Sequence, residues 1–133
     1  MKLIQISDLH ISTTGDIEIL LDKINTMLAA LGTVIKSGEK VVCFIISDII
    51  NKGENNAYEL AKPIIKKLIG GINDIVGSEN NAVEILPGNH DVCKGDLQSF
   101  NRFASDVLGK EINYSDTNSI YKLGDRRKFC VNY

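Results

Sequence analysis

Three short segments of the chain place oxygen- and nitrogen-bearing side chains directly after strand-like apolar runs. They are residues 8–10 (Asp-Leu-His), 48–51 (Asp-Ile-Ile-Asn) and 87–91 (Pro-Gly-Asn-His-Asp). Carboxylate oxygen and imidazole nitrogen bind divalent metals of hard or borderline character, and an amide oxygen is a neutral ligand. If the fold brings these segments together, their residue types predict a site for metal ions.

Taken one at a time, the segments differ in specificity. Asp48 and Asn51 after a strand also fit an Asx-turn, and Asp8 and His10 also fit a turn carboxylate beside a surface histidine. Residues 87–91 are more specific, because their Pro and Gly tighten the turn that presents the amide, the imidazole and the carboxylate. All three segments together, each at a strand end, favour a metal site over turns alone.

Strand-like and helix-like patterns alternate along the chain and position these segments. Apolar runs predict strands at about residues 2–6, 40–47 and 82–86. The middle run is apolar on both faces, which is typical of a buried parallel strand. The β-α-β-α-β-α order implies a parallel sheet with right-handed crossovers. In open α/β sheets, ligands bind at the carboxyl edge, where all three segments would lie.

The first and third helices have clear boundaries in the sequence. The first is predicted over about residues 16–37, with Asp16 as N-cap and Gly38 as a C′ glycine. The third is predicted to start near Asp96 and to stop at Gly109. Its inward residues are predicted to be Phe100, Phe103, Ala104, Val107 and Leu108.

The second helix follows a polar loop and contains potential interruptions. Asn56 and Glu59 are spaced like a capping box at its start. Pro63 removes a backbone hydrogen bond and predicts a kink, and Gly70–Gly71 predicts a weakened end. Its predicted apolar stripe is Leu60, Ile64, Leu68, Ile72 and Ile75.

Length and composition fit one globular domain. The chain has 133 residues, of which 44% are hydrophobic and 24% are charged. Its net charge of −2 does not support a nucleic-acid partner, and the basic residues 126–128 are better explained as the solvated entry to a strand at 128–131. No apolar run reaches the ~18 residues of a membrane span. Three widely spaced cysteines predict reduced thiols and a cytoplasmic location.

At these motifs the chain resembles the calcineurin-like metallophosphoesterases. It is similar to their first three motifs in Asp8-x-His10, in the Gly-Asp-x-x-Asn-like Ser47-Asp48-x-x-Asn51, and in residues 88–91 (Gly-Asn-His-Asp). The resemblance covers essentially all of residues 1–133. It implies an α/β fold, the N-terminal half of an αββα sandwich with a largely parallel sheet flanked by helices.

The resemblance also implies how metals would be bound. Asp8 and His10 would hold one ion, Asp48 would bridge two ions, and Asn89 would hold the second. The complete enzyme would use two divalent metal ions (Mn, Fe or Zn). Two such ions roughly 3.5–4 Å apart share a water, lower its pKa and clamp both oxygens of an in-line displacement.

The resemblance implies catalytic roles for two further residues. His90 would lie near the leaving group as an acid or a phosphate-stabilising donor. Asp91 would fix the imidazole of His90. A phosphate ester would be the substrate, and its identity depends on later loops that this sequence does not contain.

Two departures from the family pattern qualify these expectations. Ser47 stands where the family has Gly, either as a replacement or because the Gly was lost, which would shift the side-chain alternation of the strand. The family also completes its site with later Gly-His and Gly-His-x-His loops, whereas this chain has two histidines, His10 and His90. We therefore expect one incomplete domain over residues 1–133, with one metal or none, completed by a C-terminal half in cis or in trans.

These observations predict a metal-dependent phosphoric ester hydrolase, a phosphodiesterase or phosphatase, in truncated form. One alternative is a non-catalytic phosphoesterase-like module that binds a phosphate ligand or a partner protein. Another is a DNA exonuclease of the same superfamily, because nucleases and cyclic-nucleotide phosphodiesterases share the opening at residues 6–10 (Ile-Ser-Asp-Leu-His). The lack of a basic, aromatic-laced face weighs against a nuclease.

Overall fold

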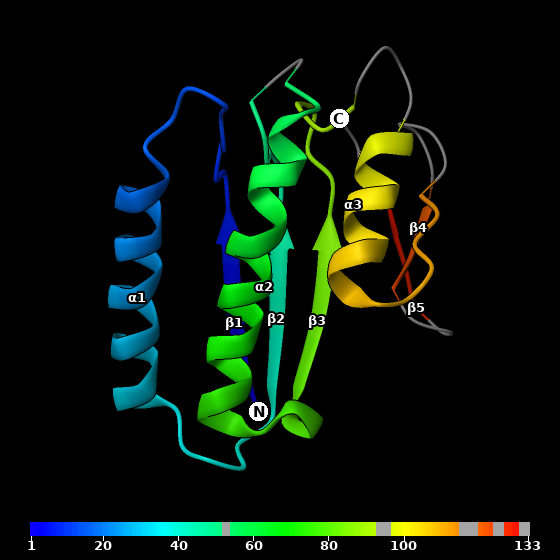
Figure 1. Cartoon of the computed structure of the whole chain (residues 1–133). Coiled ribbons are helices and arrows are strands. Elements are labelled where there is room, and N and C mark those ends of the chain that lie inside the picture. Colours follow the sequence, from blue (N-terminus) through cyan, green and yellow to red (C-terminus); the bar gives the residue numbers. More distant parts are fainter. Residues whose placement is uncertain (52–53, 93–96, 115–119, 124–126, 131–133) are drawn as a thin grey trace.

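A computed structural model describes residues 1–51, 54–92, 97–114, 120–123 and 127–130 of the chain (Figure 1). Strands and helices alternate as the sequence predicts. Their order is β1 (Lys2–Ser7), α1 (Ile17–Val34), β2 (Val41–Ile46), α2 (Ala57–Val76), a 3₁₀ turn η1 (Ser78–Asn80), β3 (Asn81–Leu86), α3 (Gln98–Leu108), β4 (Ile120–Leu123) and β5 (Arg127–Cys130).

The first three strands form one parallel sheet in the order β1-β2-β3. Ser7 pairs with Ile46 of β2, and Ile46 pairs with Leu86 of β3. All three strands therefore end at the same level, and the three ligand-bearing segments leave the same edge. The later strands β4 and β5 form a separate antiparallel pair, and β5 covers the described part of the predicted strand at 128–131.

The helices bury one face of this sheet. Figure 1 shows α2 in front of the strands, with α1 and α3 on either side of it. On β2, Val41, Cys43 and Ile45 are fully buried, whereas the alternate residues Val42, Phe44 and Ile46 are half-buried. The alternate face of β2 is thus apolar in sequence, as predicted, but the helices described cover only one side.

Helix α1 confirms its predicted start and corrects its predicted end. The Asp16 carboxylate accepts a hydrogen bond from the Ile19 backbone N–H at 3.1 Å, as an N-cap does. The helix ends at Val34, and Ile35 turns into extended backbone and is buried. Gly38 is therefore not the C′ residue, because core burial of Ile35 ends the helix earlier. Gly38 instead forms the turn into β2, with φ +77°.

Helix α2 begins after Asn56 without the predicted capping box. Asn56 has helical dihedral angles and its side chain makes no capping bond. Glu59 pairs with Lys62 at 2.9 Å instead of turning back to the cap. The prediction was wrong because the Tyr58 and Glu59 N–H groups, which a cap would bond, already donate to the Asn55 and Asn56 carbonyls at 3.3 and 3.2 Å.

The predicted interruptions do not end α2. The helix contains Pro63 and continues to Val76. A Cβ on Gly71 would collide with the side chain of Leu28, so this glycine lets α1 and α2 approach closely. Leu60 is 36% exposed, whereas Ile64, Leu68 and Ile72 are each 1% exposed. The predicted stripe is thus correct except at Leu60, because the buried residues in this part of the helix are Ala57, Tyr58 and Ala61.

Helix α3 confirms its predicted inward face and its predicted stop. Phe100, Phe103 and Ala104 are buried, and Gly109 ends the helix in the left-handed conformation with φ +63°. The predicted start at Asp96 lies outside the described residues. An ion pair of 2.8 Å joins Lys62 of α2 to Asp106 of α3.

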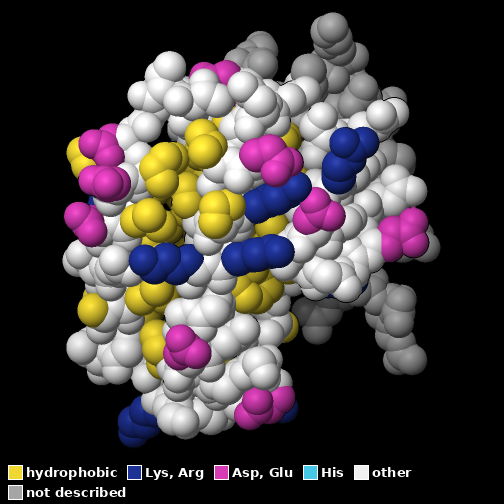
Figure 2. All heavy atoms as spheres, in the orientation of Figure 1, with side chains coloured by type: hydrophobic (Ala, Val, Ile, Leu, Met, Phe, Trp, Pro, Cys, Tyr) yellow, Lys and Arg dark blue, Asp and Glu magenta, His cyan; other side chains and the backbone are white. Residues whose placement is uncertain are grey.

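The surface over the helices is mixed in charge. Figure 2 shows acidic and basic side chains interspersed on this face, with apolar side chains between them. Among the described helices, none has the length and apolarity needed to cross a membrane. Cys43 is a fully buried free thiol, in agreement with the predicted reduced state, and burial raises its pKa to about 11.

Candidate metal centre

Backbone pairing continues past the ends of the strands and holds the three segments together. The His10 N–H donates to the Asp48 carbonyl at 3.0 Å, and the Ile11 N–H donates to the Ile49 carbonyl at 2.9 Å. On the other side, the Ser47 N–H donates to the Leu86 carbonyl at 3.2 Å. The carboxyl edge of the sheet is therefore a continuous backbone platform under the candidate ligands.

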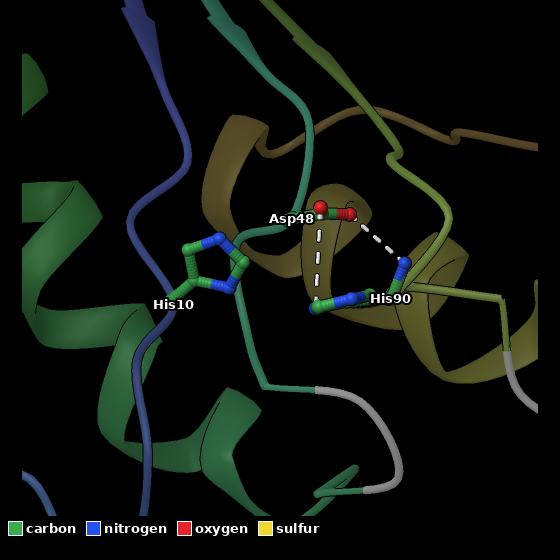
Figure 3. A group of neighbouring side chains, drawn as sticks. All are labelled: His10, Asp48 and His90. Atoms are coloured by element: carbon green, nitrogen blue, oxygen red, sulfur yellow. Dashed lines mark hydrogen bonds and ion pairs between the residues drawn. The ribbon is translucent and has the colours of Figure 1, made fainter.

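Three side chains converge on this platform. Potential ligand atoms of His10, Asp48 and His90 all lie within 4.8 Å of one another. Figure 3 shows the three side chains coming from the loops after β1, β2 and β3. The His10 and His90 rings meet edge to face, with their centroids 5.1 Å apart. Within the described part of the chain, this is the group of histidine, cysteine and acidic side chains with the spacing of a metal site.

Gly88 allows the third loop to lie directly against the second. A Cβ at this position would overlap the backbone nitrogen and Oδ1 of Asp48 and would lie 2.8 Å from the Cα of Ser47. The same approach lets the His90 N–H donate to Asp48 Oδ1 at 2.9 Å. Asp48 is only 7% exposed, so its carboxylate is fixed between two loops.

Four residues of the site have positive φ although none is glycine. The values are 56° at Asp8, 46° at His10, 64° at Ser47 and 33° at Asp48. Ser47 therefore adopts the conformation that suits the glycine of the family motif, and β2 has six residues, as do β1 and β3. The positive φ of Ser47 and the equal lengths of the three strands favour replacement of that glycine by serine over its loss.

The amide of Asn89 lies against the Asp48 carboxylate. With its nitrogen toward Asp48, the amide donates to the two carboxylate oxygens at 3.3 and 3.2 Å. To bind a metal shared with Asp48, Asn89 would turn its amide oxygen toward that metal. Asn89 is therefore close enough to Asp48 to share a metal with it, and without a metal the two side chains form hydrogen bonds.

The ring of His90 tests whether a ligand such as a metal ion fits the site. Its Nδ1 is buried without a hydrogen-bond partner, and it lies 3.9 Å from Asp48 Oδ2. A buried polar atom without a partner costs about 1–3 kcal/mol, and this one points into the group that carries the other ligands (Figure 3). A metal or a phosphate oxygen would satisfy it.

The structure places the predicted residues unequally. His10, Asp48, Asn89 and His90 come together, whereas Asp8 is exposed and does not belong to the group of three. His90, which the motif resemblance placed near the leaving group, is close enough to His10 and Asp48 to share a metal with them. The geometry thus supports a metal centre at the predicted edge with an additional nitrogen in it.

Comparison with protein families decides the relationship. The model for calcineurin-like phosphoesterases matches residues 1–133. The chain belongs to the calcineurin-like phosphoesterase family. No curated protein and no solved structure matches it. The family uses divalent metal ions, and the converging ligand atoms of His10, Asp48 and His90, with the unpartnered His90 Nδ1, fit such an ion.

In this member of the family, Asp91 has different partners from those the motif predicts. Its carboxylate is 1% exposed and accepts hydrogen bonds from the Gly88 N–H and the Tyr58 hydroxyl, both at 2.8 Å, and from the Ile49 N–H at 3.2 Å. None of the described bonds of Asp91 goes to the His90 ring. The expected support of the imidazole is therefore replaced by support of the backbone on both sides of the site.

The environment of Asp91 affects its protonation. Burial raises the pKa of Asp91 above its ordinary value, and the bonds from Gly88, Tyr58 and Ile49 oppose that increase. Tyr58 is a part of the site that the sequence analysis missed. Its only signal is a tyrosine in the first turn of the second helix, and its partner lies 33 residues further along the chain.

Proposed function

We propose that this member of the calcineurin-like phosphoesterase family is a metal-dependent phosphoric ester hydrolase, acting on phosphodiesters or phosphomonoesters. The observation that carries the proposal is the convergence of His10, Asp48 and His90 within 4.8 Å, with Asn89 beside Asp48. The buried His90 Nδ1 has no hydrogen-bond partner in this group, which supports a ligand there.

The proposed ligands follow the three loops. Asp8, His10 and Asp48 would hold one divalent metal, and Asp48 and Asn89 would hold a second. Bound divalent metals supply charge stabilisation and lower the pKa of water. The contribution of the chain is to fix the Asp48 carboxylate between two loops and to keep both histidine rings on one side of it.

We propose that His90 acts on the substrate as a proton donor to the leaving group or as a donor to a phosphate oxygen. Its backbone N–H is anchored to Asp48 at 2.9 Å, so the ring is held close to where a metal-bound ester would lie. Asp91 supports this placement through the backbone of Gly88 and Ile49.

The described ligands hold a first metal better than a second. His10 and Asp48, with Asp8, offer three protein ligands, whereas Asp48 and Asn89 offer two oxygens. Three ligands bind one ion with open positions, and two bind a second weakly. We therefore propose that full activity needs further histidine ligands, supplied in cis or in trans.

Calorimetry with Mn²⁺ and hydrolysis of a nitrophenyl phosphodiester test this proposal. We expect one weak Mn²⁺ site, slow turnover by this chain, and loss of both in Asp48→Ala. Asp106→Ala is the matched control, because it removes an exposed carboxylate of α3 away from the site. Equal Mn²⁺ binding by wild type and Asp48→Ala would refute the proposal.

The variant His90→Ala separates the possible roles of this ring. As an acid, its loss should leave Mn²⁺ bound and slow hydrolysis by about 10²–10⁴-fold for alkyl leaving groups, with a smaller effect for nitrophenyl. Equal slowing for both leaving groups would make His90 a phosphate-positioning donor. Loss of Mn²⁺ from the variant would make it a metal ligand, as its distance from His10 and Asp48 allows.

A further inference from the structure

A single carboxylate, Glu54, ties the loop after β1 to the loop after β2. It accepts hydrogen bonds from the Ser12 hydroxyl at 2.9 and 3.1 Å, from the Thr13 N–H at 2.8 Å and from the Thr13 hydroxyl at 3.0 Å. Asn51 adds a longer contact of 3.4 Å from its side-chain nitrogen. Ser12 and Thr13 lie 42 and 41 residues before Glu54, so their contact with Glu54 is tertiary.

Glu54 is itself fixed in place by the backbone around it. Its N–H donates to the Asn51 carbonyl at 3.1 Å, and its carbonyl accepts from the Ala57 N–H at 2.7 Å at the start of α2. The Asn51 N–H in turn donates to the Ile11 carbonyl at 3.1 Å. The backbone of Glu54 is therefore bonded on one side to Asn51 and on the other to the start of α2.

Glu54 is hydrogen-bonded to the loop that carries His10. Ser12 is 8% exposed and lies two residues after His10, which has a φ of 46°. A non-glycine residue in the left-handed region is strained and needs surrounding contacts to hold it there. The bonds to Glu54 come directly after this strained position and oppose its relaxation.

Glu54 does not belong to the group of potential metal ligands. Both of its carboxylate oxygens already accept hydrogen bonds, and Glu54 would have to give these up to bind a metal. We propose that Glu54 is a positioning residue, which holds the His10 loop against the Asp48 loop and thereby sets the metal affinity of the site. This inference rests on the proposed metal-dependent function.

The first experiment measures the contact without metal. Amide hydrogen exchange of Ile11 and Asn51, whose N–H groups bridge the two loops, is compared in wild type and in Glu54→Gln. We expect exchange about tenfold faster in the variant. Asp106→Asn is the control, because it also removes a hydrogen-bonded carboxylate but one that joins α2 to α3.

The second experiment measures Mn²⁺ affinity by calorimetry, at a temperature at which all variants are folded. Groups that orient metal ligands change affinity by about 10–100-fold when they are removed. We expect about a tenfold loss in Glu54→Gln and a smaller loss in Ser12→Ala, with Asp106→Asn unchanged. If Glu54→Gln does not fold, Ser12→Ala serves as the test variant in its place.

The results separate the two proposals. Faster exchange with weaker Mn²⁺ binding supports the positioning role. Unchanged exchange at Ile11 and Asn51 overturns it, and so does faster exchange with wild-type Mn²⁺ affinity, because Glu54 would then be a structural contact alone. If the wild-type chain binds no Mn²⁺, both the proposed metal-dependent function and the role of Glu54 in metal affinity are refuted. The exchange data still show in that case whether Glu54 joins the two loops.

Discussion

The two edges of the parallel sheet place positive φ angles on different kinds of residue. At the amino edge, the turns into β2 and β3 use glycine for positive φ, with 77° at Gly38 and 89° at Gly77. At the carboxyl edge, positive φ falls on Asp8, His10, Ser47 and Asp48. Glycine adopts this region without strain, whereas a side chain costs about 1–2 kcal/mol there.

Burial differs between the two edges in the same way. In the described chain, the buried polar residues are Ser12, Asp48 and Asp91, and all three lie in the loops at the carboxyl edge. Burying such groups is unfavourable unless each is paired. The carboxyl edge has strained residues and buried polar side chains, whereas the amino edge uses glycine. We therefore expect the functional site at the carboxyl edge. The comparison thus supports the metal centre independently of its ligand distances.

The largest expected effect comes from adding a side chain at Gly88, where the third loop packs against the second. In Gly88→Ala, the new methyl group would overlap Asp48, so we expect the free energy of unfolding to fall by about 1–3 kcal/mol, as for an overpacked core, together with Mn²⁺ affinity. Gly70→Ala is the control, since a Cβ there meets nothing within 4 Å. It should stabilise α2 by about 1 kcal/mol. Denaturant unfolding measures both, and equal effects would refute the close approach.

The next effect tests whether the buried charge of Asp91 matters more than an ordinary buried hydrogen bond. Tyr58→Phe removes a donor at 2.8 Å from this carboxylate, and we expect a loss of about 1–3 kcal/mol in unfolding free energy. Tyr114→Phe removes a hydroxyl that donates to the neutral Ile85 carbonyl at 2.9 Å, for about 1 kcal/mol. A larger loss for Tyr114→Phe would contradict the comparison.

A smaller effect, of opposite sign, is expected at the departure from the family motif. Ser47→Gly should raise the free energy of unfolding by about 0.5–1 kcal/mol, because relief of a left-handed serine exceeds the extra chain entropy of glycine. Ser37→Gly is the same substitution at a residue without positive φ, and it should lower stability by about 0.5–1 kcal/mol. Thermal unfolding of the two variants checks the sign, and destabilisation by Ser47→Gly would argue against strain at this position.

The smallest effect is a pH dependence. The N–H of Thr13 and then the hydroxyl of Ser12 lower the pKa of Glu54. A lowered folded pKa gives stability that is present above the unfolded value, about 4.3 for Glu, and is lost as pH falls through the folded pKa. The stability difference between wild type and Glu54→Gln should therefore be largest near pH 7 and should shrink below about pH 4. A stability difference that does not change with pH would mean that the charge of Glu54 does not contribute to stability.

Much of the fold could be predicted because its signals are local. The apolar periodicities located the three strands and three helices, and Asp16 was recognisable as an N-cap from its position alone. Gly38 and the Asn56–Glu59 pair also have local signals, but these were overridden by burial of Ile35 and by the turn before α2. Local patterns fail where a nearby tertiary contact offers a better partner.

The sequence alone predicted that three ligand-bearing segments leave one edge of a parallel sheet, because alternating strand and helix patterns imply parallel strands. It could not assign the partners of Glu54 and Asp91, which lie 41, 42 and 33 residues away. The bonds of Asp91 form because Gly88 packs against the second loop and α2 places the Tyr58 hydroxyl beside it. The bonds of Glu54 form where the Asn51 N–H joins the second loop to Ile11 of the first. Hydrogen bonds need distances near 3 Å, and only the packed tertiary structure sets such distances between remote residues.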